Sequence, residues 1–156
     1  MAKRHLEVCG EYGFSVGDQR HRAVFNGIWD LPMKFQVSGL YFFGSGERFA
    51  TSYGTDLRNL GTTSGERRLR PDGTIVPRND FVGKAIHRVD LRVQRRFPLG
   101  GRVGVDGILE LFNAFNHANY GSYTTQEVSR SYGTPSQNAN VAYAPRMLQL
   151  GFRLAF

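Results

Sequence analysis

The sequence predicts an all-β chain, an antiparallel meander of about five long strands that is a fragment of a transmembrane β-barrel and cannot close alone. Three observations predict this fold. Apolar and polar residues alternate over stretches of roughly 11 to 14 residues, about twice the usual strand length in soluble domains. The connections between the stretches are alternately very short and very long. Gly, Phe and Tyr are plentiful, at 19, 12 and 7 residues, which favours strands over helical bundles.

The first two expected strands, 20–31 and 33–44, alternate less tidily than the others. In each of them, large apolar residues or glycines recur at every second position and so fall on one face of a strand. The two sets are Ala23, Phe25, Gly27, Trp29 and Leu31, and Phe35, Val37, Gly39, Tyr41 and Phe43. Only Pro32 separates these strands, so we expect a tight turn between them.

The next two expected strands, 86–97 and 102–115, each have a mostly apolar face and a polar face. Their apolar sets are Val89, Leu91, Val93 and Phe97, and Val103, Val105, Leu109, Leu111 and Phe115. The polar faces include five charged residues that we expect to line an aqueous lumen: Arg88, Asp90, Arg92, Asp106 and Glu110. A three-residue hairpin loop over 98–100 would set Arg92 opposite Asp106 and Arg88 opposite Glu110, each pair contributing about 0.2–1 kcal/mol. We interpret these charges as a ladder that neutralises a barrel wall, in preference to a wall that guides a substrate.

The last expected strand, 145–156, has the clearest alternation. Its apolar face consists of Leu148, Leu150, Phe152, Leu154 and Phe156. At about 3.3 Å per residue and a tilt near 45°, about eleven residues rise roughly 25 Å, the height of the lipid-facing band of a barrel. The strand lengths therefore favour a membrane barrel over a soluble sandwich.

The two long connections, 45–85 and 116–144, are polar and rich in turn-forming residues. Outer-membrane barrels have short periplasmic turns and long extracellular loops. We therefore expect 45–85 and 116–144 to lie outside the cell, and residues 1–19 to be the remnant of an extracellular loop. The short turns at Pro32 and Pro98 would then be periplasmic.

Aromatic residues cluster near the expected periplasmic ends of the strands. Trp29, Phe35 and Phe97, with the terminal Phe156, are expected at one depth, as in an interfacial aromatic girdle. Arg95 interrupts an apolar face at the same end, where a charge costs roughly 0–1 kcal/mol and can meet lipid head groups.

Several function classes lack support in the sequence. No nucleophile motif, phosphate-binding loop or cofactor motif occurs, so we expect no enzymatic activity and no cofactor. The four His residues are scattered and the single Cys is alone, so we expect no metal site. The net charge of +7 comes mainly from Arg residues that form no single stripe, so we expect no nucleic-acid binding. No apolar run reaches the roughly 18 residues of a spanning helix, and residues 1–11 have no apolar core of a secretion signal.

From about residue 20 to the end, the chain resembles the C-terminal part of a TonB-dependent outer-membrane receptor, of the large Oar-like type with a carboxypeptidase-regulatory-like N-terminal domain. The segments that carry the resemblance are His21–Phe25 with Asp30-Leu31-Pro32, Arg70–Gly73 with Pro77-Arg78-Asn79, Val89–Val93 with Arg96-Phe97, Glu110–Tyr120, and Pro145–Phe156. The terminal Phe156, with Leu154, Phe152, Leu150 and Leu148, resembles the signal that the barrel-assembly machinery recognises in its clients.

The resemblance implies a plugged barrel of 22 strands in the outer membrane of a Gram-negative-type bacterium. It implies import of a scarce ligand with energy from an inner-membrane TonB complex. The implied partners are outer-membrane lipid and lipopolysaccharide, the barrel-assembly machinery, the TonB complex, and the plug and other strands of the receptor. Residues 20–156 lack a plug and hold only about a quarter of such a barrel, so we expect no transport by this segment alone.

Two alternatives make different structural predictions. A small soluble basic β-domain that binds an anionic polymer, such as nucleic acid, would bring the apolar stripes together in one sealed interior. A complete small barrel would need an even number of strands, such as eight, in a closed ring. The exposure of the apolar stripes and the closure of the sheet separate both alternatives from the barrel fragment.

Overall fold

A computed structural model describes residues 12–57, 59, 61, 68–136 and 144–156. The chain divides into two compact units. Residues 21–45, 85–119 and 139–156 form the first, here called the sheet unit. Residues 1–20, 46–84 and 120–138 form the second, here called the loop unit. The described part of the chain holds no helix with the length and apolar character that a membrane crossing requires.

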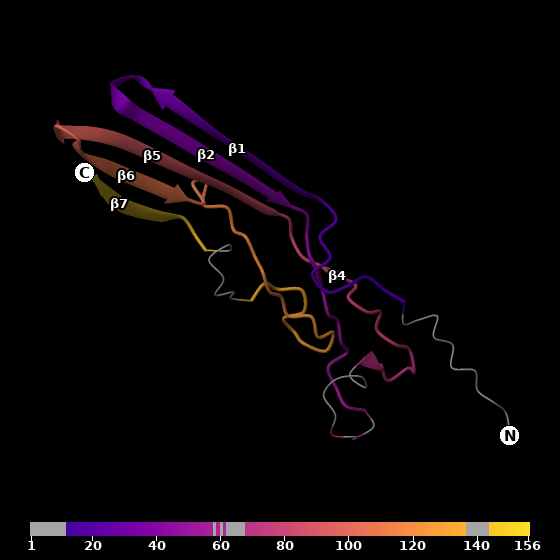
Figure 1. Ribbon diagram of the computed structural model, residues 1–156. Coiled ribbons are helices and arrows are strands. Elements are labelled where there is room, and N and C mark those ends of the chain that lie inside the picture. The colour runs from indigo at the N-terminus through magenta and orange to yellow at the C-terminus, as the bar shows by residue number, and fades with distance from the viewer. Residues whose placement is uncertain (1–11, 58, 60, 62–67, 137–143) are drawn as a thin grey trace. The chain divides into compact units, whose positions relative to one another are not determined.

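The sheet unit is built around one antiparallel sheet of five long strands, in the order β1-β2-β5-β6-β7 (Figure 1). The strands are β1 (Arg22–Leu31), β2 (Phe35–Gly44), β5 (Ile86–Gly100), β6 (Val103–Phe112) and β7 (Met147–Ala155). Neighbouring long strands follow one another along the chain, which confirms the predicted all-β meander. Among the described residues the sheet is open, because β1 and β7 each pair along one edge only. The closed small barrel is therefore not the fold that the structure shows.

Both hairpin turns lie at the same end of the sheet, which is called here the turn end (Figure 1). A 3₁₀ turn, η2 (Pro32–Lys34), joins β1 to β2, with Met33 and Lys34 at φ of 59° and 62°. The β5–β6 turn passes through Gly100 and Gly101 at φ of 122° and 58°, where a side chain would be strained. The C-terminal end of β7 reaches this same end of the sheet.

The predicted register of the β5–β6 hairpin is wrong. β5 continues to Gly100, a β-bulge lies between Pro98 and Gly100, and Gly100 pairs with Val103. Because the chain turns at residues 101–102 instead of 98–100, Arg92 lies opposite Glu110 instead of Asp106. Arg88 lies beyond the residues of β5 that pair with β6 and is opposite Phe42 of β2.

β6 ends at Phe112, three residues earlier than predicted, because Asn113 adopts a left-handed conformation with φ of 48°. Asn113 is 2% exposed, and its amide holds the chain that leaves the strand. The amide nitrogen donates to the carbonyls of His117 (2.9 Å) and Ala144 (3.1 Å), and the amide oxygen accepts from the His117 N–H (3.0 Å). Asn119 likewise bonds both the N–H and the carbonyl of His87.

The loop unit contains a two-stranded sheet of β3 (Arg48–Phe49) and β4 (Phe81–Val82). The rings of Phe49, Phe81 and Tyr123 pack against one another, with centroids 5.1–6.2 Å apart. Both long connections therefore contribute to one packed structure, although 58, 60, 62–67 and 137–143 lie outside the described residues. Most of the expected loop remnant 1–19, from 1 to 11, also lies outside them.

Candidate functional site: the two faces of the sheet

The register of the five long strands places every residue on one of two faces. The face called here the outer face carries the apolar stripes, including Phe25, Trp29, Val37, Val93, Leu109 and Leu150. The face called here the inner face carries nine charged residues: Arg22, Asp30, Arg88, Asp90, Arg92, Arg96, Asp106, Glu110 and Arg153. Within the long strands, Arg95 is the single Arg, Lys, Asp or Glu on the outer face.

Many of the large apolar side chains of the outer face are exposed, and the others are half-buried. Leu150 is 76% exposed and Phe152 is 83% exposed, and Leu148, Leu154 and Phe156 are exposed as well. Among the described residues, Val76 and Ile86 are the buried hydrophobic side chains. A soluble β-domain would bring its apolar stripes together in one sealed interior. The apolar stripes of this sheet do not converge in that way.

The outer face carries an aromatic cluster at the end opposite the turn end. Tyr41, Phe43, His87 and His117 form it, and we call it the upper belt. The Tyr41 hydroxyl lies 3.0 Å from His87 Nδ1, and the His87 ring lies 5.1 Å from the rings of Phe43 and His117. The sequence pattern does not predict this cluster, because His117 follows β6 and reaches His87 only in the folded chain.

Of the four aromatics predicted at one depth, Trp29, Phe35 and Phe97 lie on the outer face near the turn end, and we call these three the lower belt. Trp29 and Phe97 are exposed and Phe35 is half-buried. They do not share one cross-strand row: Phe35 lies opposite Arg95, whereas Trp29 and Phe97 lie two residues to either side of that row. On β5, ten residues separate Phe97 from His87 of the upper belt, which at a tilt of about 40° is a rise of about 25 Å.

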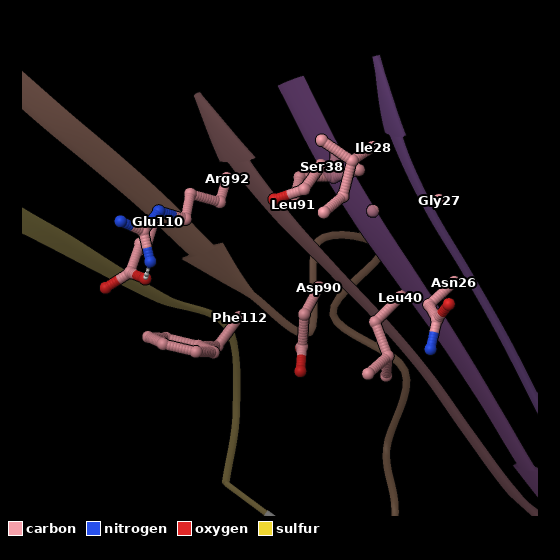
Figure 2. Close-up of a pocket in the computed structure, with 11 residues that line it drawn as sticks. Asn26, Gly27, Ile28, Ser38, Leu40, Asp90, Leu91, Arg92, Glu110 and Phe112 are labelled. Atoms are coloured by element: carbon pink, nitrogen blue, oxygen red, sulfur yellow. Dashed lines mark ion pairs between the residues drawn. The ribbon is translucent and has the colours of Figure 1, made fainter. Parts of the chain in front are cut away.

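The inner face has a hollow of about 370 Å³ at the middle of the sheet (Figure 2). Its lining residues come from β1, β2, β5 and β6, and Figure 2 shows Arg92, Glu110, Asp90 and Phe112 around it. Apolar atoms, including those of Ile28, Leu40 and Phe112, make up most of the lining of this hollow. The charged residues Asp90, Arg92 and Glu110 lie beside this apolar surface.

The charges around the hollow pair with one another. The Arg88 guanidinium donates to Asp90 at 2.8 Å, and the same carboxylate accepts the Asn113 N–H at 2.9 Å. Arg92 lies 3.5 Å from Glu110, its partner in register, and donates to Gln94 at 3.1 Å. The ladder thus uses different partners from those predicted, since Arg88 pairs along its own strand and Arg92 pairs with Glu110.

Asp106 lies nearer the turn end of the inner face and is 2% exposed. Its Oδ2 accepts two hydrogen bonds from Arg153, at 2.9 and 2.6 Å. Its Oδ1 is buried with no hydrogen-bond partner among the described atoms. Arg96 is directly opposite Asp106, but its guanidinium lies over Gly104, 3.4 Å from where a Cβ would stand.

The loop unit holds an ion pair that joins the two long connections. Arg70 donates through two nitrogens to both carboxylate oxygens of Glu127, each at 2.7 Å. These hydrogen bonds lower the pKa of Glu127 and raise the pKa of Arg70. The N–H and hydroxyl of Thr74 donate to Asp72 and lower the pKa of that carboxyl.

The described residues contain no group of three or more His, Cys, Asp or Glu side chains arranged to hold a metal ion. His5 and Cys9 lie outside the described residues. His21 bonds Ser45 through its backbone N–H, and His87 and His117 belong to the upper belt.

Comparison with known proteins gives one match. A family model described as an outer membrane beta barrel domain matches residues 71–149, which is half of the chain. This range includes β4, β5, β6 and the start of β7, and so both faces described above. No curated protein and no solved structure shows significant similarity to the chain.

Proposed function

Since the chain belongs to the outer membrane beta barrel domain family, we propose that its sheet is the C-terminal wall of a TonB-dependent receptor that imports a scarce ligand. Family membership gives an outer-membrane location. The receptor class rests on the motifs that the chain shares with such receptors, above all Glu110–Tyr120 and Pro145–Phe156.

The contrast between the two faces is the observation that carries this proposal. The outer face is an apolar band between the upper and lower belts, and the roughly 25 Å between them equals the usual height of a barrel's lipid-facing band. The inner face carries nine charged residues, which an aqueous or protein-filled barrel interior accommodates. In this arrangement lipid contacts Leu150 and Phe152, and the receptor's interior contacts Arg92 and Glu110.

The two open edges support a larger barrel. In the described part of the chain, no strand lies beside the outward edges of β1 and β7, which present backbone N–H and C=O groups. In hydrocarbon each unsatisfied group costs several kcal/mol, so a membrane sheet needs a further strand at both edges. The other strands of the receptor would supply them, and its plug would occupy the interior beside the hollow.

The loop unit would be the ligand-contacting part outside the cell. Its packed rings and the Arg70–Glu127 pair connect the two long connections into one structure, so it can present a fixed surface. The exposed terminal stripe from Leu148 to Phe156 would serve as the recognition signal for the barrel-assembly machinery.

The orientation can be tested by labelling intact cells. In a Cys9→Ser background of the natural protein, a membrane-impermeant maleimide should label Asp72→Cys in the loop unit. It should label Arg102→Cys, at the turn end, only after the outer membrane is permeabilised. Labelling of both positions, or of Arg102→Cys alone, in intact cells would refute the orientation.

The receptor class can be tested by genetic interaction. We expect deletion of the gene to reduce growth on at least one limiting nutrient. In cells depleted of TonB, the deletion should cause no further loss, because import already lacks its energy source. An equal loss with and without TonB would contradict the receptor proposal and leave the outer-membrane location unaffected.

A further inference from the structure

Arg95 is the exception on the outer face. Its guanidinium carbon lies 4.8 Å from the centre of the Phe35 ring and 4.9 Å from the centre of the Phe97 ring. Gly107, opposite Arg95 on β6, has no side chain, and the Phe97 ring lies 3.4 Å from where its Cβ would stand. The missing side chain leaves room for the Phe97 ring beside Arg95. We call this trio the Phe35–Arg95–Phe97 clamp.

The clamp holds a cation that no carboxylate of the sheet neutralises. Asp90, Asp106 and Glu110 project from the inner face, whereas Arg95 projects from the outer face. Arg95 makes no ion pair with a described carboxylate. A charge at the boundary of a lipid band is stable where an anion or water can reach it.

Aromatic contacts suit a guanidinium that binds an oxyanion. Rings stack on the flat faces of the group and leave its N–H donors at the edges. Those edges match the spacing of phosphate oxygens and can donate to two of them at once. The clamp lies in the lower belt, at the depth where lipid phosphates border the apolar band.

We propose that the Phe35–Arg95–Phe97 clamp binds the phosphate of a phospholipid in the periplasmic leaflet. The inference rests on the lipid-facing orientation of the outer face proposed above. The charge of the guanidinium selects an anionic head group, and the exposed apolar side chains beside it accept the acyl chains. The clamp would hold one lipid at a fixed position on the wall.

Native mass spectrometry of the natural protein, purified in detergent, tests this site. The probes are phosphatidylglycerol and a digalactosyl lipid, which has matched acyl chains but no phosphate. We expect wild type to retain phosphatidylglycerol preferentially, and Arg95→Gln to bind it about tenfold more weakly, as loss of a charge-assisted bidentate contact predicts. Arg96→Gln is the matched control, because Arg96 is the next residue and lies on the inner face; it should bind like wild type.

Two further arms separate the remaining outcomes. Inorganic phosphate in excess should leave the lipid bound, because it lacks the acyl chains; displacement of the lipid by inorganic phosphate would overturn the assignment to phospholipid. If Arg95→Gln does not fold, Arg95→Lys keeps the charge without the planar group and should bind severalfold more weakly. Equal lipid retention by wild type and the Arg95 variants would overturn the proposal. Failure of TonB dependence would leave the lipid result unchanged, because lipid binding requires no transport.

Discussion

A charge placed on the outer face at mid-height should destabilise the barrel by about 2–4 kcal/mol. Leu150→Arg is the informative change, because Leu150 is 76% exposed and would be a harmless surface position in a soluble protein. Leu150 lies four residues above Leu154, which shares a row with Val105 and Phe97 of the lower belt. Four residues along a tilted strand rise about 10 Å, which puts Leu150 close to the middle of a band about 25 Å high.

The neighbouring Gln149 provides the control, because it lies on the inner face opposite Glu110. Gln149→Arg should change the free energy of unfolding by no more than about 0.5 kcal/mol. Leu154→Arg, at the level of the lower belt, should cost only about 0–1 kcal/mol. Urea unfolding of the natural barrel refolded in phosphatidylcholine vesicles measures all three variants. Equal costs at Leu150 and Gln149, or at Leu150 and Leu154, would refute the assignment of the outer face to lipid.

Two further predictions concern the ends of the strands and the loop unit. Asn113→Ala should destabilise the protein by about 2–4 kcal/mol, because it removes three hydrogen bonds of a buried amide and leaves Ala at a φ of 48°. Asn113→Gly removes the same hydrogen bonds but relieves the backbone strain. It should therefore be about 1 kcal/mol more stable than Asn113→Ala in the same urea assay. Folding of the loop unit lowers the pKa of Glu127 below its ordinary value of 4.5. The pair with Arg70 therefore stabilises the folded loop unit fully above pH 4.5, and this contribution is lost as the pH falls through the lowered pKa. Proteolysis of the loop unit should therefore rise on acidification towards pH 3 in wild type and depend less on pH in Glu127→Gln; an identical pH dependence in both would contradict this account.

The faces of the strands could be predicted from the sequence because they depend only on a period of two. Leu148, Leu150 and Phe152 alternate with Gln149 and Gly151, and this order alone decides which side chains share a face. No knowledge of neighbouring strands is needed. The separation of apolar from charged residues follows from this local property, whereas the fold class also depended on the alternation of short and long connections.

Contacts between distant residues could not be predicted in the same way. The Arg70–Glu127 pair joins residues 57 positions apart, and no periodicity relates them. The upper belt likewise depends on where the chain goes after β6, which Asn113 and Asn119 determine through hydrogen bonds to backbone groups. These asparagines lie within the motif Glu110–Tyr120, which the sequence analysis used only as a mark of resemblance. Their structural role became visible with the backbone path.

The error in the β5–β6 hairpin shows which inferences tolerate a wrong register. The predicted pairing of Arg92 with Asp106 differs from the observed pairing with Glu110 by four residues. An even shift leaves every side chain on its face, whereas a shift of one residue would have exchanged the two faces. The lipid-facing assignment depends only on the face and therefore survives the error. The charge ladder depends on which residues are opposite, so its partners had to come from the turn at Gly100 and Gly101.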